Sequence, residues 1–255
     1  MKNQKLTVQF NRKIAKDVYH MSLAGDCSEI ERPGQFINIL VDDFFLRRPI
    51  SIFDHDSEHV EILYKVVGGG TFALAEKKPG DMLDVLLPLG NGFDVSKRGA
   101  RTLLVAGGIG MPPIHEIAKL LRNETKTADD FRVLIGFRTR DEMFGLDSFE
   151  ALGIEPIVAT EDGSYGEKGL VTDVMDKLKH PAPREDAYDF DYVMCCGPEP
   201  MLKAVYEHSS DGQFSFEERM GCGFGACMGC SCETKYGYKR ICKDGPILYS
   251  EEIKW

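Results

Sequence analysis

The chain has 255 residues, of which 43% are hydrophobic and 28% charged, proportions typical of a soluble globular protein rather than a disordered one. Its formal net charge of -10 argues against nucleic acid or an anionic membrane surface as a partner. The length suffices for two domains, or for two domains and a small appendage.

The first 23 residues alternate between polar and apolar types. They contain neither a signal-peptide core nor an apolar run long enough to span a membrane. We therefore expect a cytoplasmic protein with no membrane association. Cysteines in that reducing compartment are not expected to form disulfides, and five of the eight follow residue 220, which favours a metal site there.

The first hundred residues are predicted to be rich in β-structure. Short runs with alternating or continuous apolar residues are separated by breaks such as Pro-Gly and Asp-Asp; they cover residues 6–10, 18–23, 35–41 and 60–67. Several short strands at this spacing indicate a small antiparallel barrel, which we assign to residues 1–99.

Two segments of this barrel could bind phosphate groups. In "LRRPIS", the planar fork of Arg48 suits a pyrophosphate and the Ser51 hydroxyl could complete an anion site. In "GGGTFALA", glycines before Thr71 could place the start of a short helix against a second phosphate. Each signal is weak alone, because two surface arginines are more often simply solvated.

Residues 100–212 show a different pattern, in which strands alternate with helices. "RTLLVAGGIGMPPIHEIAKLL" indicates a buried strand, a glycine turn and an amphipathic helix. Further apolar strands are predicted at residues 131–137, 154–160 and 191–198, and helices at 147–152, 170–178 and 200–208. This alternation predicts a doubly wound parallel sheet that binds its ligand beyond the carboxyl ends of the strands.

The glycine turn of this domain departs from the usual dinucleotide motif. Gly108 and Gly110 are present, but Pro113 stands at the third glycine position, so nucleotide binding and tight helix packing both stay open. Cys196 ends a predicted strand, where it could be a small buried residue or lie beside a nicotinamide. We expect His115 to have a packing or surface role only.

The second strand of the sheet is followed by "RTRDE", where an adenosine 2'-phosphate would be recognised. Arg138 and Arg140 could bind that phosphate, but Asp141 and Glu142 follow at once and would repel it. This balance of charge favours NAD over NADP.

The last part of the chain, residues 213–255, carries the spacing Cys222-x4-Cys227-x2-Cys230-x11-Cys242, with Cys232 left over. C-x4-C-x2-C with a distant fourth cysteine is typical of a [2Fe-2S] cluster, and the glycines between the thiols would let backbone N–H groups approach its sulfur atoms. A four-cysteine zinc site is the alternative, although zinc sites usually use two C-x2-C pairs. We predict a small module held together by its metal.

Taken in chain order, the "RPIS" barrel, the "GGIG" turn and the later "CGP" resemble the ferredoxin-reductase family. The resemblance implies a barrel that binds FAD and a second domain that binds a nicotinamide dinucleotide. The residues that it implies for FAD are Arg48, Pro49, Ile50, Ser51, Lys65, Val66, Val67, Gly70 and Thr71. Those that it implies for the dinucleotide are Gly107, Gly108, Gly110, Cys196, Gly197 and Pro198. Ile50 stands where the family often has an aromatic residue that stacks near the flavin.

The carboxyl-terminal "ERMGCGFGACMGC" with "CKDGP" narrows the resemblance to the electron-transfer subunits of type B dihydroorotate dehydrogenases. It implies Cys222, Cys227, Cys230 and Cys242 as cluster ligands and a heterotetramer with an FMN-containing catalytic subunit. Electrons from dihydroorotate would pass through the cluster to FAD and on to NAD+, in pyrimidine biosynthesis. We identify no catalytic residue for dihydroorotate in this chain.

Two other functions stay open from the sequence. The chain could be an NAD(P)H-dependent reductase subunit for another acceptor, such as a ferredoxin, a hydrogenase or a bifurcating complex. It could also be a module stapled by zinc that has no redox activity. For an electron-transfer subunit, we expect the outer loops around Phe224, Met228 and residues 246–249 to contribute to the interface with the partner, because apolar side chains there would otherwise face solvent.

Overall fold

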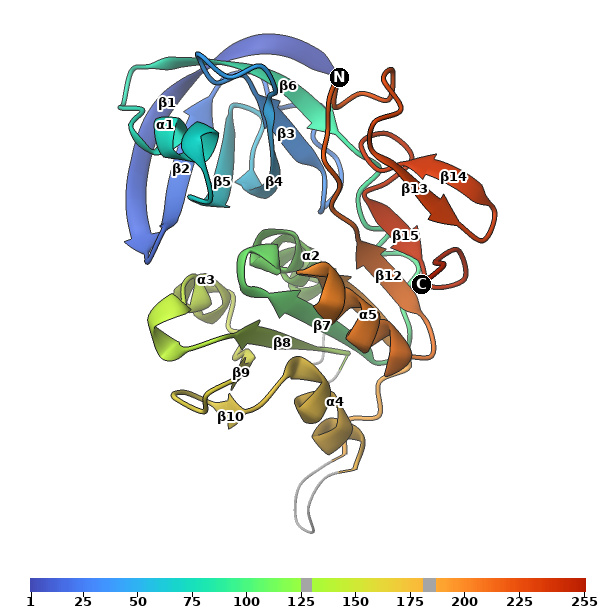
Figure 1. Ribbon diagram of the computed structural model, residues 1–255. Helices are drawn as coiled ribbons and strands as arrows, with labels where there is room; N and C mark the ends of the chain where they lie inside the picture. Colours follow the sequence, from blue (N-terminus) through green and yellow to red (C-terminus); the bar gives the residue numbers. More distant parts are fainter. Residues whose placement is uncertain (125–129, 181–186) are drawn as a thin grey trace. The chain divides into compact units, whose positions relative to one another are not determined.

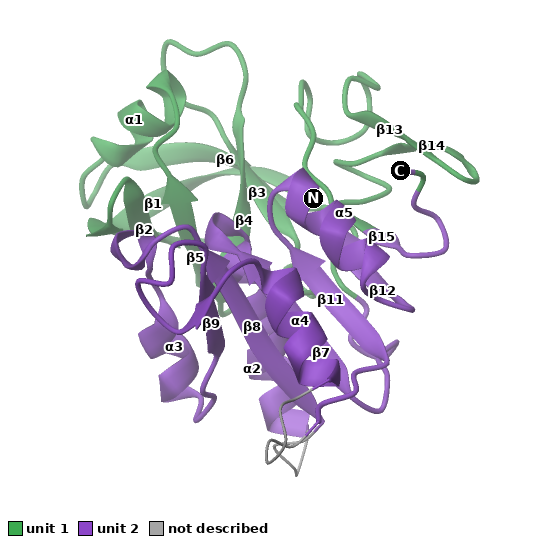
Figure 2. Ribbon diagram, turned by 60° about the horizontal axis from the view of Figure 1, so that its bottom comes forward, with its two compact units in different colours: residues 1–93, 216–247, 254 green, residues 94–215, 248–253, 255 purple. Residues whose placement is uncertain are grey.

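The computed structural model describes residues 1–124, 130–180 and 187–255 (Figure 1). They form two compact units (Figure 2). Unit 1 comprises residues 1–93, 216–247 and 254, and unit 2 comprises residues 94–215, 248–253 and 255. No helix among the described residues is long and apolar enough to cross a membrane.

Unit 1 is built around a closed barrel of six antiparallel strands in the order β1-β2-β5-β4-β3-β6. The strands are β1 (Lys2–Ala15), β2 (Val18–Ala24), β3 (Phe36–Ile39), β4 (Arg48–His55), β5 (His59–Lys65) and β6 (Met82–Leu89). Alternate apolar residues such as Leu6, Ile37 and Ile62 are fully buried and form the core. The predicted barrel is confirmed, and β4 and β6 are strands that the apolar pattern did not single out.

The short helix α1 (Gly69–Ala75) follows β5, as the glycine-rich segment predicted. Residues 216–247 belong to the same unit as the barrel and contain one antiparallel hairpin, β13 (Ser231–Thr234) and β14 (Gly237–Arg240). The rest of this segment is largely irregular chain that carries the clustered cysteines.

Unit 2 contains a sheet in the order β10-β9-β8-β7-β11-β12-β15, in which neighbours from β10 to β12 are parallel. Its strands are β7 (Thr102–Gly107), β8 (Phe131–Phe137), β9 (Ile157–Thr160), β10 (Glu167–Lys168), β11 (Tyr192–Cys196), β12 (Gly212–Ser215) and β15 (Ile247–Tyr249). Because β7, β8 and β11 are buried along most or all of their length, they read as nearly continuous apolar runs.

Helices cover both faces of this sheet: α2 (Met111–Glu124) and α3 (Leu146–Ala151) contact each other, and so do α4 (Val171–Lys179) and α5 (Glu199–Glu207). The two pairs lie on opposite sides of the sheet (Figure 2). Two short 3-10 turns, η1 (Gly108–Gly110) and η2 (Arg140–Glu142), follow β7 and β8. The doubly wound parallel fold is therefore confirmed.

The three-part division at residues 99 and 212 assigns a cofactor to each part, and it stays a prediction. The two compact units divide the chain differently, because residues 216–247 join the barrel and β12 extends the sheet to Ser215. Gly212–Ser215 is buried along its whole length and continues the sheet beside β11.

Candidate functional site

The four predicted cluster cysteines lie in two pairs within unit 1. The backbone N–H of Cys222 donates to Cys227 Sγ at 3.4 Å, and the N–H of Cys227 donates to Cys222 Sγ at 3.5 Å. The N–H of Cys242 donates to Cys230 Sγ at 3.4 Å. Two thiolates per iron are what a four-cysteine, two-iron cluster uses. The pairing therefore suits two metal ions, and the described residues contain no group of three or more His, Cys, Asp or Glu that could hold a single ion.

Backbone donors surround the first pair of thiols. Ala226 N–H donates to Cys222 Sγ at 3.2 Å, and Gly229 N–H donates to Cys227 Sγ at 3.4 Å. Desolvation opposes ionisation of Cys222, but hydrogen bonds from its neighbours outweigh it and lower the pKa of this thiol to about 6. These hydrogen bonds therefore favour the thiolate of Cys222, which is the form that binds iron.

The second pair is buried. Cys230 is 2% exposed and Cys242 is 1% exposed. Burial, together with the nearby Cys230 thiol, raises the pKa of Cys242 to about 12. Binding of a metal ion by Cys242 would therefore release a proton from this buried thiol.

A side-chain ion pair anchors the loop that carries the first two thiols. Arg240 donates to both carboxylate oxygens of Asp244, at 2.8 and 2.9 Å, and its Nη1 donates to the Gly225 carbonyl at 2.9 Å. Hydrogen bonding from Arg240 lowers the pKa of Asp244 to about 2. Gly225 adopts a positive φ of 88°, which only glycine takes without strain.

Cys232 lies apart from these pairs, on β13 opposite Lys239 of β14. Its thiol donates to the Glu233 carbonyl at 3.7 Å. This position on the hairpin agrees with its being the cysteine left over from the ligand set.

The residues that the resemblance implies for FAD lie together around Arg48. Its guanidinium lies 4.8 Å from the centre of the Phe44 ring and touches Gly70, where any Cβ would overlap it. Its Nη1 also donates to the Leu46 carbonyl. A planar cation beside a glycine at the start of α1 can approach a pyrophosphate closely.

The chain between β5 and α1 is ordered by Thr71. Its Oγ1 accepts hydrogen bonds from the N–H groups of Val67 and Gly68, at 2.9 and 3.2 Å, and donates to the Gly68 carbonyl. Val66 packs against the barrel core, whereas Val67 is 80% exposed. The Val67 side chain is therefore accessible to a ligand, as the resemblance implies.

The remaining residues of this group are distributed along β4 and β5. Ile50 packs against the barrel core and pairs with Ile37, while Pro49 pairs with Asn38 and Ser51 with Phe36. Lys65 ends β5. Ile50 thus helps to fill the barrel.

The predicted dinucleotide residues meet at the carboxyl ends of β7 and β11, which are neighbouring parallel strands. A Cβ on Gly110 would overlap the Cys196 carbonyl, and one on Gly197 would lie 3.1 Å from the Gly107 backbone nitrogen. Pro198 caps α5, and a Cβ on Gly107 would lie 2.9 Å from its Cδ. The glycines are therefore required where the two turns touch, at the edge where such folds bind nucleotides.

Cys196 is 3% exposed, so its thiol is mostly covered by protein. His115 is 4% exposed and its ring meets Phe149 edge to face at 5.1 Å, as expected of a packing residue. Arg138 forms a two-pronged ion pair with Glu142, at 2.6 and 3.1 Å. Because Glu142 already neutralises Arg138, this arginine is not available to bind the 2'-phosphate of NADP, which favours NAD.

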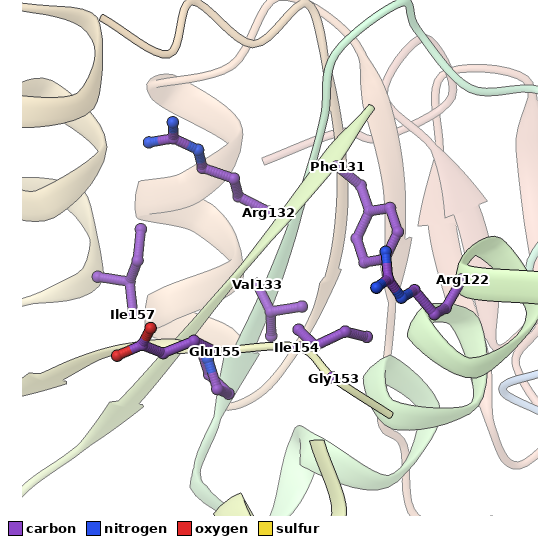
Figure 3. Close-up of a pocket in the computed structure, with 9 residues that line it drawn as sticks. Arg122, Phe131, Arg132, Val133, Gly153, Ile154, Glu155 and Ile157 are labelled. Atoms are coloured by element: carbon purple, nitrogen blue, oxygen red, sulfur yellow. The ribbon is translucent and has the colours of Figure 1, made fainter. Parts of the chain in front are cut away.

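A separate pocket of about 550 Å³ opens at the amino ends of β8 and β9 (Figure 3). Its lining includes Arg122, Phe131, Arg132 and Glu155. The guanidinium of Arg132 lies 4.4 Å from the Tyr188 ring centre. Because this pocket is at the opposite ends of the strands from the glycine turns, we assign the nucleotide to the turns and not to it.

Two neighbours of the site were missed from the sequence. Phe44 stacks on Arg48, and its signal was the aromatic pair directly before "LRRP". Asn38 is a polar residue inside the apolar "FINIL" and lies against Gly223 of the cysteine loop. Of residues 246–249, which were expected at an interface, 246–248 are buried and Tyr249 is half-buried, with Ile247 and Leu248 each 1% exposed.

Comparison with known families agrees with this geometry. Residues 217–254 match the iron-sulfur cluster binding domain of dihydroorotate dehydrogenase B. Residues 104–207 match the oxidoreductase NAD-binding domain.

Curated relatives match over the whole chain. The "Dihydroorotate dehydrogenase B (NAD(+)), electron transfer subunit" of Geobacillus sp. (strain WCH70) is 41% identical to this chain. The match covers 99% of this chain and 99% of that protein. The protein of the same description from Fusobacterium nucleatum is 43% identical over 100% of this chain and 99% of its own length.

A solved structure of an NADH-dependent reduced ferredoxin-NADP oxidoreductase, studied for flavin-based electron bifurcation, superposes with a TM-score of 0.85. It is 32% identical, and the match covers 98% of this chain and 90% of that one.

Proposed function

The chain belongs to the electron transfer subunits of NAD(+)-dependent dihydroorotate dehydrogenase B, and from this premise we propose that it carries electrons from an FMN-containing catalytic subunit to NAD+. Its cofactors are a [2Fe-2S] cluster, FAD and NAD, and its pathway is pyrimidine biosynthesis. It works with a catalytic partner subunit.

The observation that carries the proposal is the arrangement of the cysteines. One pair of thiols, Cys222 and Cys227, lies on a loop with several backbone donors, and the second pair joins Cys230 at the end of that loop to Cys242 beyond β14. Cys227 is exposed and Cys242 is buried. A [2Fe-2S] cluster moves one electron, a nicotinamide moves two as hydride, and a flavin can exchange electrons with both. We therefore assign Cys222, Cys227, Cys230 and Cys242 to the cluster and place FAD between the cluster and NAD in the order of transfer.

The protein groups have separate tasks in this scheme. Arg48 would neutralise the FAD pyrophosphate, and Thr71 would hold the turn that contacts the flavin. The glycines at Gly107, Gly110 and Gly197 let the two turns pack closely together at the strand ends where the dinucleotide would bind. No residue of the chain is assigned a proton-transfer step, because dihydroorotate is oxidised on the partner.

We propose that the partner docks over the exposed side of the cysteine loop. Phe224 is 42% exposed and Met228 is 53% exposed, and both flank the exposed Cys227. Short distances favour electron transfer, so a thiol pair at the surface suits a centre that receives electrons from another protein. We further propose a complex of two chains of each kind, and a cytoplasmic location in keeping with eight cysteines outside disulfides.

The test is reconstitution of the whole reaction. The isolated holo-chain should oxidise NADH with an artificial dye and fail to oxidise dihydroorotate. Adding the FMN-containing subunit should restore transfer from dihydroorotate to NAD+, and a Cys227→Ser chain that retains FAD should not support it. Dihydroorotate oxidation by the chain alone, or full NAD+ reduction by the complex without the cluster, would show the relay to be wrong.

A second function is favoured by one observation, the 32% identity to the bifurcating NADH-dependent oxidoreductase. The name of that protein indicates a ferredoxin as its redox partner. If the native partner recovered with this chain contained no FMN and no dihydroorotate activity but reduced a ferredoxin, this second function would replace the first.

A further inference from the structure

Asn38 is a buried polar residue with no hydrogen-bond partner for its side chain. It is 1% exposed, and neither its Nδ2 nor its Oδ1 has a partner among the described residues. Its main-chain carbonyl, in contrast, accepts a bond from Arg47 at 3.3 Å. A buried amide without a partner is costly, so one is retained where a bound group supplies the partner.

The barrel around Asn38 offers no such partner. Asn38 lies opposite Pro49 on β4 and opposite Leu86 on β6, and neither side chain can form a hydrogen bond. Its neighbours in the strand, Ile37 and Ile39, belong to the barrel core. The amide therefore lies on the other face of β3 from that core.

On that face the amide meets the cysteine loop. A Cβ on Gly223 would overlap Asn38 Nδ2, and Gly223 has a positive φ of 80°, so this glycine lets the loop close on the amide. Gly223 directly follows Cys222. Sulfur atoms of this loop act as hydrogen-bond acceptors, since the N–H groups of Ala226 and Cys227 donate to Cys222 Sγ.

We infer that Asn38 is a positioning residue for the cluster, whose side-chain amide donates a hydrogen bond to a sulfur atom of the bound [2Fe-2S] group and raises its reduction potential. Reduction adds negative charge to the sulfur atoms, and a donor stabilises that charge. Because Asn38 pairs with Pro49, the same residue fixes the cysteine loop against the strand that we assign to FAD. The inference rests on the proposed ligand set.

The test uses the full chain with FAD and cluster, and compares Asn38→Leu with Asn11→Leu. Leucine is close to asparagine in shape and lacks the amide. In an EPR-monitored redox titration, the ratio of reduced to oxidised cluster at a fixed potential should fall about threefold to tenfold in Asn38→Leu, since one hydrogen bond is lost. A tenfold fall equals a shift of about 59 mV for one electron.

Asn11 is the matched control because its amide is satisfied within the same barrel, by the carbonyls of Leu74, Ala75 and Lys77 at 3.0 to 3.2 Å. Asn11→Leu should lower the melting temperature of the apoprotein and leave the cluster potential unchanged. Asn38→Leu should lower the cluster potential and should not lower the melting temperature of the apoprotein.

An unchanged cluster potential in Asn38→Leu, or a shift confined to the flavin, would overturn the inference. So would a large fall in apoprotein stability, because it would show that the amide has a structural partner in the protein itself. A wild-type chain without cluster absorption would instead contradict the proposed function, so the two failures are distinguishable.

Discussion

The cysteine loop of unit 1 and the glycine turns of unit 2 are held in shape by different means. The turns at Gly110 and Gly197 join strands to helices, and their contact is fixed by two paired strands. The loop from Cys222 to Cys230 has no regular structure and is held by N–H bonds to sulfur and by Arg240. The turns are therefore preformed, whereas we expect the loop to depend on its metal for much of its order.

This difference predicts the largest effect for loss of a cluster ligand. Cys230→Ser should abolish the visible absorption of the cluster and reduce bound iron to a small fraction of the wild-type amount, because a four-thiolate site loses one ligand. Protease cleavage within residues 216–247 should also become faster. Iron analysis and limited proteolysis measure both effects.

Cys232→Ser is the control for that experiment, because Cys232 lies on the hairpin and not in either pair. It should keep the absorption and the iron. Equal loss of iron in both variants would contradict the ligand assignment.

The next effect concerns the preformed turns. Gly110→Ala should weaken NADH binding by tenfold or more, because the new Cβ overlaps the Cys196 carbonyl and overpacking typically costs about 1–3 kcal/mol. Titration of NADH by calorimetry measures the change, and the cluster absorption should stay normal.

Gly108→Ala is the comparison that separates backbone strain from overlap between the two turns. Gly108 has a positive φ of 49°, but no atom lies within 4 Å of the place that a Cβ would take, so only backbone strain of about 1–2 kcal/mol is added. It should weaken NADH binding less than Gly110→Ala does. The opposite ranking would mean that close approach of the two turns is not what the glycines serve.

Loss of Arg48 should have a comparable or smaller effect, confined to the flavin. Arg48→Ala removes a charge-assisted contact worth about 1.5–3 kcal/mol, and thus roughly tenfold or more in FAD affinity. Flavin release on dilution, followed by fluorescence, checks this. Arg48→Lys keeps the charge without the planar fork, so its FAD affinity should fall between those of Arg48→Ala and wild type. FAD retention equal to wild type in Arg48→Ala would mean that the arginine is only solvated.

The smallest effect is expected from the anchor of the cysteine loop. Arg240→Ala removes the bonds to Asp244 and to the Gly225 carbonyl, but the pair is partly open to solvent, so cluster loss to a chelator should accelerate only about two- to fivefold. Lys254→Ala, which removes the exposed pair with Glu233, is the control and should not change the rate. A rate as fast as in a ligand variant would mean that the anchor, and not the iron, orders the loop.

Much of the fold could be predicted because the spacing of apolar residues is regular within each region. The apolar runs of β7 and β11 and the helical spacing of α2 indicate a parallel sheet directly. The cysteine spacing favours an iron-sulfur cluster because C-x4-C-x2-C with a distant fourth cysteine is typical of [2Fe-2S] ligands, whereas zinc sites usually use two C-x2-C pairs. Strand β4 was missed because Pro49 lies near its start, and strand β6 was missed although its apolar residues Leu83 and Val85 precede Pro88.

Contacts between distant segments could not be predicted. Nothing in the sequence near Asn38 shows that Gly223 closes on it, and nothing near Arg48 shows that Gly70 does. The burial of Pro246–Leu248 likewise depends on tertiary packing: Phe216 N–H donates to the Pro246 carbonyl at 2.9 Å, and Ile247 N–H donates to Asn91 at 3.1 Å. Local pattern identifies which residues carry the chemistry, and packing decides which of them meet.

The central claim is that electrons pass between NAD and the cluster by way of FAD on this one chain. Rapid mixing of the holo-chain with NADH, followed at the flavin and cluster absorption bands and by freeze-quench EPR, tests it directly. We predict that the flavin band bleaches first and the cluster signal of the reduced state follows, and that a chain stripped of FAD shows no cluster reduction. Cluster reduction at the same rate without FAD would contradict the account.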